Sequence, residues 1–164
     1  MGSESASRLV GPAHARLRLT IEARGGQLER VRLLPAEGAE AEEAGTGLAA
    51  EVGDRLVADP GGAGRGFPDW PLAPPRTPFQ GRLRATLQAL HPGQTVSYRD
   101  LATTLGSAPR AVAMAARANP FPLIVPCHRV VAVDGPGGYA GASEGPLAAF
   151  KAWLLEEEAA RGVD

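Results

Sequence analysis

The sequence of 164 residues contains a single cysteine, Cys127. One thiol cannot form an intramolecular disulfide, and it cannot supply the two or more thiolates of a cysteine-based zinc site. We therefore expect no disulfide framework and no metal site built on two or more cysteines. We also predict that the chain binds no other metal and no cofactor. Without further context, a lone cysteine is more often a buried packing residue than a nucleophile, so its neighbours have to decide between these roles.

Long apolar segments are missing as well. No uninterrupted apolar run approaches the roughly 20 residues that span a bilayer, and the first ten residues, MGSESASRLV, lack the apolar core of a signal peptide. We expect no membrane contact, a cytoplasmic location and a monomer. The hydrophobic share of 44% and the charged share of 21% are those of an ordinary globular protein with one core or two small lobes.

Lysine is nearly absent. Lys151 is the only one, and all other permanently charged basic side chains are arginines. The formal net charge of −1 averages two regions of opposite sign. Residues 37–59 carry seven acidic side chains against Arg55, whereas residues 76–130 carry seven arginines against Asp100. The arginine-rich region can therefore meet a polyanion, although the whole chain is close to neutral.

The first half of the chain predicts a small sheet with a helix. Residues 15–22 alternate apolar and polar side chains, which is the period of a half-buried strand. Gly25 and Gly26 then permit a tight turn into a second strand over residues 27–34. Farther on, apolar residues at four-residue spacing predict a helix around residues 48–56.

A segment rich in proline and glycine separates this region from the rest. Residues 59–77 contain too many of both for regular structure, and we interpret them as a linker. The predicted organisation is an N-terminal α/β lobe with its linker over residues 1–72 and a second domain over residues 76–164.

The second domain begins with a well-marked helix. Thr77 is typical of an N-cap, Pro78 suits the first helical position, and Gln80 completes a capping box. Apolar residues then recur on one face, so we predict a helix over residues 78–90.

Two further short helices resemble a helix-turn-helix. Ser97 and Asp100 form a second capping box, Gly106 suits the end of that helix, and a third helix is predicted over residues 109–118. The third helix is rich in alanine and offers few groups that read base edges. On its own it is therefore more often a buried helix than one that faces DNA, but its slim surface would also permit close approach to a DNA backbone or a narrow groove.

The neighbours of Cys127 favour chemistry over packing. His128 and Arg129 follow it directly, and a nearby base or positive charge is what converts a thiol with a pKa of about 8.5 into a reactive thiolate. Since neighbours along an extended chain point apart, a turn or a bridging water would have to bring His128 and the sulfur together.

Several stretches of the second domain resemble the O6-alkylguanine-DNA alkyltransferase family. The resemblance covers residues 77–158 and rests on the motifs TPFQ (77–80), VSY (96–98), NP (119–120), IVPCHRVV (124–131), GGYAG (137–141) and KAWLLEEE (151–158). It implies an α+β fold, with a ribonuclease H-like N-terminal lobe built from an antiparallel β-sheet and a helix. It also implies a mostly helical, winged-helix-like C-terminal lobe with a helix-turn-helix.

The resemblance implies a chemical role for five residues. Cys127 would accept the alkyl group in a single irreversible reaction, His128 would take the thiol proton through a water, and Glu158 would orient His128. Tyr98 would donate to the leaving guanine and help to rotate the nucleotide out of the duplex, and Asn119 would tie the helices to the active-site turn. Without the family, Glu158 is a solvated helix end and Asn119 is a helix C-cap.

The resemblance also implies double-stranded DNA with O6-alkylguanine as the partner, bound through the minor groove. Arg110 would fill the space of the extruded base, although an ordinary surface arginine is the simpler interpretation. The expected DNA-binding residues are Arg110, Tyr98, Ala111, Ala115, Arg117 and Arg129. The expected base pocket is made by Val130, Tyr139, Ala140 and Pro122.

Two other functions stay open at this point. One is a lesion-binding protein without transfer activity, against which the presence of Cys127 argues. The other is a helix-turn-helix regulator, against which the alanine-rich third helix argues. The stretch between Tyr139 and Lys151 is longer than the family pattern, and Ala142 stands where a second glycine is usual, so the rim of the pocket is expected to differ.

Overall fold

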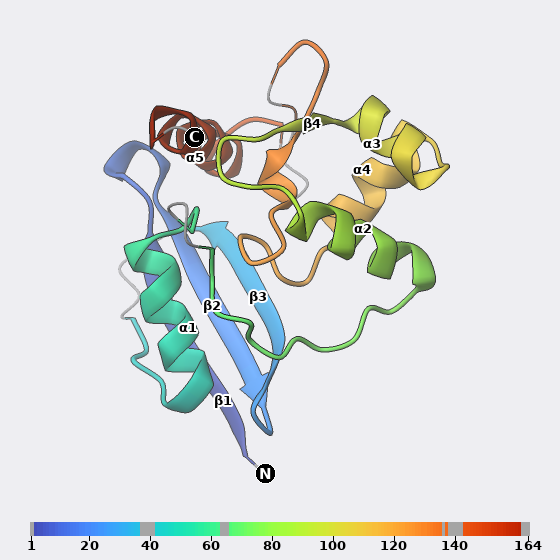
Figure 1. Ribbon diagram of the computed structural model, residues 1–164. Coiled ribbons are helices and arrows are strands. Elements are labelled where there is room, and N and C mark those ends of the chain that lie inside the picture. Colours follow the sequence, from blue (N-terminus) through green and yellow to red (C-terminus); the bar gives the residue numbers. More distant parts are fainter. Residues whose placement is uncertain (1, 37–41, 63–65, 136, 138–142, 162–164) are drawn as a thin grey trace.

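The computed structural model describes residues 2–36, 42–62, 66–135, 137 and 143–161. Figure 1 shows a three-stranded sheet with helix α1 on one side, and a helical C-terminal part in which helix α5 returns to one end of the sheet. This arrangement confirms the expected α+β class, with an antiparallel N-terminal sheet and a mostly helical C-terminal part.

The N-terminal sheet is an antiparallel meander of β1 (Ser3–Val10), β2 (Leu17–Arg24) and β3 (Gln27–Pro35). Strand β2 is the one that the alternating pattern predicts, and β3 is the second strand expected after the glycine turn. Gly25 and Gly26, both with positive φ, form that turn. The alternate residues Leu17, Leu19 and Ile21 of β2 are fully buried. A polar stretch, SESASRLV, forms β1, which the sequence pattern did not indicate.

Helix α1 (Gly47–Ala58) covers one face of the sheet (Figure 1). It buries Val52 and Leu56, two of the apolar residues whose four-residue spacing predicts the helix. Burial of each such side chain contributes about 1.5–3 kcal/mol, so this face fixes the helix on the sheet. Arg8 of β1 also attaches this helix and the segment before it to the sheet. Its Nε donates to Asp54 at 3.0 Å, and its Nη2 donates to the Ala44 carbonyl at 2.7 Å.

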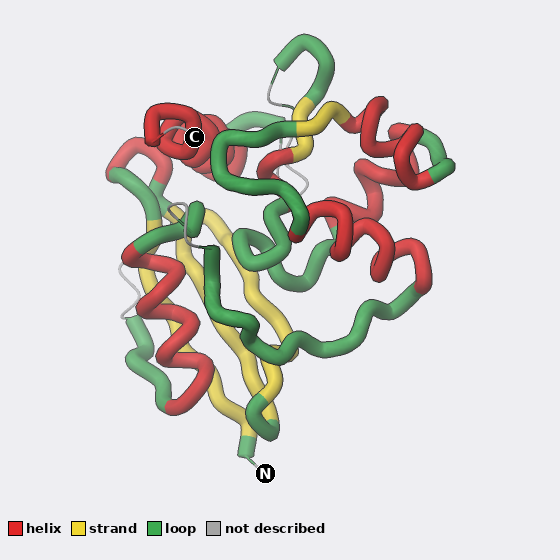
Figure 2. The backbone as a smooth tube through the Cα atoms, in the orientation of Figure 1, coloured by secondary structure: helices red, strands yellow, loops and turns green. Residues whose placement is uncertain are grey.

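The predicted linker is irregular, but its second part is packed against the sheet. Leu28 exchanges backbone hydrogen bonds with it, donating to the Pro71 carbonyl at 2.8 Å and accepting from the Ala73 N–H at 2.8 Å. Trp70 is buried, and its indole N–H donates to Glu51 of α1 at 2.8 Å. The green segment in Figure 2 that runs from α1 past the sheet to the helices is therefore attached to the N-terminal lobe over much of its length.

The first helix of the C-terminal part is α2 (Pro78–Gln88), which ends two residues before the predicted limit. The Thr77 hydroxyl oxygen accepts from the Gln80 N–H at 3.1 Å, as the capping pattern predicts. The Gln80 side chain does not complete the capping box. It donates instead to the Ala115 carbonyl at 3.2 Å, and this bond ties α2 to α4.

The next two helices, α3 (Tyr98–Leu105) and α4 (Pro109–Arg117), form the predicted helix pair. The Ser97 hydroxyl oxygen accepts from the Asp100 N–H at 2.9 Å, and Gly106 ends α3 in the left-handed conformation at φ 65°. Just before α3, the two-residue strand β4 (Val96–Ser97) pairs in parallel with β5 (Val130–Val131), which follows the cysteine.

Helix α5 (Pro146–Arg161) connects the two parts of the molecule. It contacts the short 3₁₀ helix η1 (Ala13–Ala15) and the sheet on one side, and the turn that carries Cys127 on the other. A second connection is a backbone hydrogen bond of 2.8 Å from the Val31 N–H of β3 to the Pro120 carbonyl, just after α4. Within the described ranges, no helix has both the length and the apolarity needed to cross a bilayer.

Candidate active site

Cys127 begins a single 3₁₀ turn, η2 (Cys127–Arg129), between the helix pair and β5. Pro126 precedes this turn, and Leu123, four residues before Cys127, has a left-handed backbone at φ 75°. A non-glycine residue in this region costs of the order of 1 kcal/mol or more. The surrounding contacts must therefore hold the segment in place.

Asn119 provides such contacts at the end of α4. Its side-chain N–H donates to the Val125 carbonyl at 2.9 Å, and its side-chain oxygen accepts from the Phe121 N–H at 3.0 Å. The Asn119 side chain also lowers the pKa of the Cys127 thiol. It thus connects the helix pair with the turn of the cysteine.

The Cys127 thiol is buried, with 7% of the residue exposed. Burial raises the pKa of the thiol, while the Asn119 side chain and the positive charge of Lys151 lower it only in part. The resting side chain is therefore a protonated thiol, and a base has to remove its proton before the sulfur can attack.

His128, which follows Cys127 in the same 3₁₀ turn, forms a buried pair with Glu158. His128 is completely buried, and its Nε2 lies 2.7 Å from Glu158 Oε2 on α5. Burial alone would raise the pKa of Glu158, but hydrogen bonds and charges from His128 and Arg129 lower it overall. Glu158 is therefore an ionised acceptor, so Nε2 of His128 carries the hydrogen.

This pairing leaves the other ring nitrogen of His128 as a base. Burial lowers the pKa of His128 despite the opposing effect of Glu158, so the ring is neutral near pH 7. With the hydrogen on Nε2, Nδ1 keeps its lone pair, and it has no hydrogen-bond partner among the described residues. A proton taken up at Nδ1 would be stabilised by the Glu158 carboxylate across the ring.

Arg129 is not placed to bind DNA, which corrects the expectation from the sequence. It is 5% exposed, and its Nε donates to Glu158 Oε1 at 2.9 Å. Its Nη1 donates to the Leu90 carbonyl at 2.8 Å and its Nη2 to the Gly61 carbonyl at 3.0 Å. A buried guanidinium is stable only with such partners, and here they attach Glu158 to the linker.

Lys151 lies in the candidate site, although the sequence analysis assigned it no role. It is completely buried, its ammonium donates to the Val130 carbonyl at 2.7 Å, and it lies 5.7 Å from the centroid of the Tyr98 ring. Burial lowers its pKa from 10.5 to about 8, against the effect of Cys127. Its position as the single lysine, seven residues before Glu158 and so on the same face of a helix, was a signal that could have indicated it.

Tyr98 lies at the start of α3, half-buried, on the same side as Lys151. Burial raises the pKa of its phenol, and a negative charge on Cys127 raises it further. The phenol is therefore a proton donor at neutral pH and is close enough to Cys127 for their charges to interact. Gly137 passes close by, since a side chain there would lie 3.2 Å from the Tyr98 ring.

The remaining residues of the expected base pocket fall in different places. The Val130 carbonyl accepts from Lys151 and has a second lone pair for another donor. Pro122 is buried and lines a cavity of about 580 Å³ between β3 and α2, together with Asn119. Tyr139 and Ala140 lie outside the described residues, as does Ala142.

The residues that α4 exposes are only partly the ones expected to bind DNA. Arg110 and Arg117 are exposed as expected. Ala115 is only 7% exposed and packs toward α2, so it offers little surface to DNA, and Ala111 is half-buried. The exposed positions between the two arginines are Ala113 and Met114. We call Arg110, Ala113, Met114 and Arg117 the α4 stripe.

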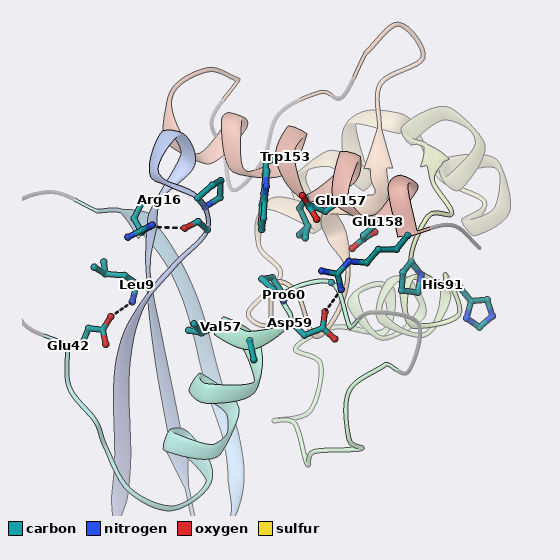
Figure 3. A pocket seen from close by; sticks show the side chains of 17 residues that line it. Leu9, Arg16, Glu42, Val57, Asp59, Pro60, His91, Trp153, Glu157 and Glu158 are labelled. Atoms are coloured by element: carbon teal, nitrogen blue, oxygen red, sulfur yellow. Dashed lines mark hydrogen bonds and ion pairs between the residues drawn. The ribbon is translucent and has the colours of Figure 1, made fainter. Parts of the chain in front are cut away.

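A larger cavity of about 1010 Å³ lies on the other side of Glu158, between the lobes. Figure 3 shows Trp153, Glu157 and Glu158 of α5 facing Pro60 and Asp59 of the linker across it, with His91 at one side. Glu158 and Gly61 both line this cavity, so the cavity reaches the carboxylate that binds His128. No group of three or more His, Cys, Asp and Glu side chains in the described part of the chain is arranged to hold a metal ion.

The sequence matches a family model over residues 78–160, described as 6-O-methylguanine DNA methyltransferase, DNA binding domain. It is also similar to a methylated-DNA–protein-cysteine methyltransferase of Thermococcus sibiricus, with 41% identity over 83 residues. That alignment covers 50% of this chain and 45% of the relative, so less than half of the relative's length is matched.

Solved structures extend the similarity to both lobes. A variant of the O6-methylguanine methyltransferase of Mycobacterium tuberculosis superposes with a TM-score of 0.70 and 26% identity, covering 98% of this chain and 96% of that one. The Mycobacterium tuberculosis protein in complex with DNA superposes with a TM-score of 0.69 and 26% identity, covering 94% and 93% of the two chains.

Proposed function

Because this chain belongs to the 6-O-methylguanine DNA methyltransferase family, we propose that it repairs DNA by moving an alkyl group from O6 of guanine to Cys127. The observation that carries the proposal is the buried His128–Glu158 pair in the turn of the only thiol, with Nδ1 of His128 left as an acceptor. Such an arrangement of nucleophile, base and orienting carboxylate serves nucleophilic attack.

The reaction begins when the Cys127 thiol loses its proton to Nδ1 of His128 through a water. Glu158 stabilises the imidazolium, while Arg129 keeps Glu158 ionised, so that the carboxylate does not take the proton itself. Lys151 is close enough to Cys127 to stabilise the thiolate by its positive charge.

The sulfur then attacks the alkyl carbon in line with the C–O6 bond. A carbon–sulfur bond forms while the carbon–oxygen bond breaks, and the electron pair of that bond leaves with guanine. The Tyr98 phenol, whose raised pKa keeps it protonated, donates a hydrogen bond to the leaving base. The product is a thioether on Cys127, and because nothing in this scheme cleaves it, each protein reacts once.

Access to the lesion requires that the base leaves the duplex. The α4 stripe is the surface that supports DNA binding, with Arg110 and Arg117 exposed at its two ends. Because α4 carries no Asn, Gln or Ser, it supports binding through the minor groove with little sequence readout. In this proposal Arg110 fills the space left by the base, and a monomer suffices, since every group in the chemical scheme comes from one chain.

Intact-protein mass spectrometry tests the proposal directly. The full chain is mixed with a duplex that contains O6-methylguanine, and Cys127→Ala serves as the control. We expect a gain of one CH₂ unit that saturates at one per protein and maps to the Cys127 peptide. A lesion duplex that binds without any gain would make the chain a recognition protein, and neither binding nor gain would overturn the proposal.

A further inference from the structure

The α4 stripe contains one large apolar side chain, Met114, between its two arginines. The four stripe residues stand at helical positions i, i+3, i+4 and i+7, which lie on one face. The opposite face holds Val112 and Ala115, both buried against the helical lobe. The position of Met114 therefore follows from the packing of α4, and its side chain points away from the protein.

Met114 is 67% exposed, which is as much as any large apolar residue in the described part of the chain. Val133 has the same exposure, and Leu34 and Val57 are less exposed at 42% and 38%. Isolated apolar residues on a surface are common and need no explanation by themselves. The distinctive feature of Met114 is its position, one helical turn from an exposed arginine on either side.

We propose that Met114 inserts into the minor groove of duplex DNA and packs against the sugars and base edges there. The proposal rests on the proposed function, since it takes the α4 stripe as the DNA-facing surface. Apolar side chains, methionine among them, are frequent in proteins that bind the minor groove. An unbranched thioether adapts to different surroundings, which suits a protein that must search DNA of any sequence.

Charge identifies the partner as a polyanion. Helix α4 carries Arg110 and Arg117 and no acidic residue. A second copy of the chain that docked through the same face would bring four arginines together without compensation, which opposes self-association. Two arginines about 10 Å apart along the helix axis, with an apolar side chain between them, fit phosphates on either side of a groove.

An apolar contact and an arginine contact affect the salt dependence of the Kd for duplex differently. Arginine contacts with phosphates release counterions, so the loss of one reduces the slope of log Kd against log salt concentration by about one. An apolar contact releases no counterions. Loss of the Met114 side chain should therefore weaken binding by the same factor at every salt concentration and leave the slope unchanged.

The experiment measures the Kd of the full chain for an undamaged duplex by fluorescence anisotropy at several salt concentrations. We expect Met114→Ala to raise the Kd about three- to tenfold at each concentration, in line with the burial of part of a methionine side chain. Met114→Leu should restore most of the affinity. Val133→Ala removes an equally exposed apolar side chain outside the stripe and should bind like the wild type.

Transfer to free O6-methylguanine base separates this inference from the proposed function. Met114→Ala should react with the free base as fast as the wild type, because the site around Cys127 is unchanged. A Met114→Ala protein that binds duplex as tightly as the wild type, or a changed salt slope, would overturn the Met114 contact. A wild-type chain that binds no duplex, or transfers no alkyl group, would overturn the proposed function instead.

Discussion

The region around Cys127 and the α4 stripe differ in almost every physical respect. Around Cys127 the charged side chains are buried and have fixed partners. Arg129 donates to Glu158 at 2.9 Å, and Lys151 donates to the Val130 carbonyl at 2.7 Å. On the stripe, Arg110 and Arg117 are exposed. Buried charges need fixed partners, whereas the stripe is suited to a partner that arrives from solution.

This difference suggests that chemistry and DNA binding can be changed separately. A substitution around Cys127 should alter proton transfer and leave the affinity for duplex unchanged. A substitution on the stripe should alter affinity and salt dependence and leave transfer to a free base unchanged. Variants that mix the two effects would show that the two regions are coupled.

The largest effect is expected from Glu158→Gln. The amide can no longer stabilise a protonated His128, so transfer should slow by about 10² to 10⁴, the range of general acid–base catalysis. The rate is measured by mass spectrometry under single-turnover conditions, with the duplex Kd measured in parallel. Glu156→Gln, an exposed neighbour on the same helix, is the matched control. A Glu158→Gln protein within threefold of the wild-type rate would contradict the assigned role of the pair.

A smaller effect is expected on the stripe. Arg117→Ala should weaken binding of duplex about tenfold at low salt and reduce the salt slope by about one. Its rate with free O6-methylguanine base should equal that of the wild type. Arg24→Ala, an exposed arginine on the N-terminal sheet, is the control. An unchanged salt slope for Arg117→Ala would remove Arg117 from the DNA contact.

A further substitution tests whether the linker supports the chemistry. A methyl group at residue 61 would lie 2.7 Å from Glu158 Oε2, so Gly61→Ala should displace that carboxylate and slow transfer about tenfold. Affinity for duplex should not change. The control is Gly81→Ala on α2, where a methyl group would make ordinary contacts of 3.4 Å or more. Equal rates for Gly61→Ala and the wild type would show that Glu158 does not depend on the linker.

The smallest effect concerns stability and pH. Because the folded pKa of Lys151 is about 8 and its ordinary value is 10.5, the unfolded chain binds more protons between these values. Its contribution to stability therefore increases as pH rises through this window. The free energy of unfolding should gain about 1–2 kcal/mol from pH 8 to 10 relative to Lys151→Met.

Urea unfolding of both proteins measures this difference, in a Cys127→Ala background that removes the thiol whose charge acts on Lys151. A difference between the two proteins that stays constant from pH 8 to 10 would show that Lys151 is not protonated as described.

Short-range signals in the sequence predicted most of the secondary structure. Strand β2 follows from alternation, β3 follows from the glycine turn, and the starts of α2 and α3 follow from Thr77 and Ser97 as caps. Strand β1 was missed because its residues are largely small or polar. Its place in the sheet comes from pairing with β2, which is a long-range interaction.

The sequence predicted the site residues that a family motif contains. It did not predict the role of residues for which burial in the fold decides what the side chain contacts. The pairing of His128 with Glu158 agrees with the expectation from the family. Arg129 was misassigned because arginine is usually exposed, and only the fold shows that Glu158 and two carbonyls surround it. On α4, composition could not show which face of the helix points to solvent. Ala115 was therefore expected on the exposed face, which instead carries Met114.

Lys151 also gives the protein an unusual property toward chemical reagents. It carries the only side-chain amine of the sequence, and that amine is completely buried. An amine-acylating reagent would therefore modify a side chain only when α5 moves away from Val130 and Tyr98. Once exposed, the amine would return toward its ordinary pKa of 10.5, so a more alkaline buffer would be needed to give a reactive neutral fraction. The rate of acylation at this one position would then report how often the core beside Cys127 opens, without an engineered probe.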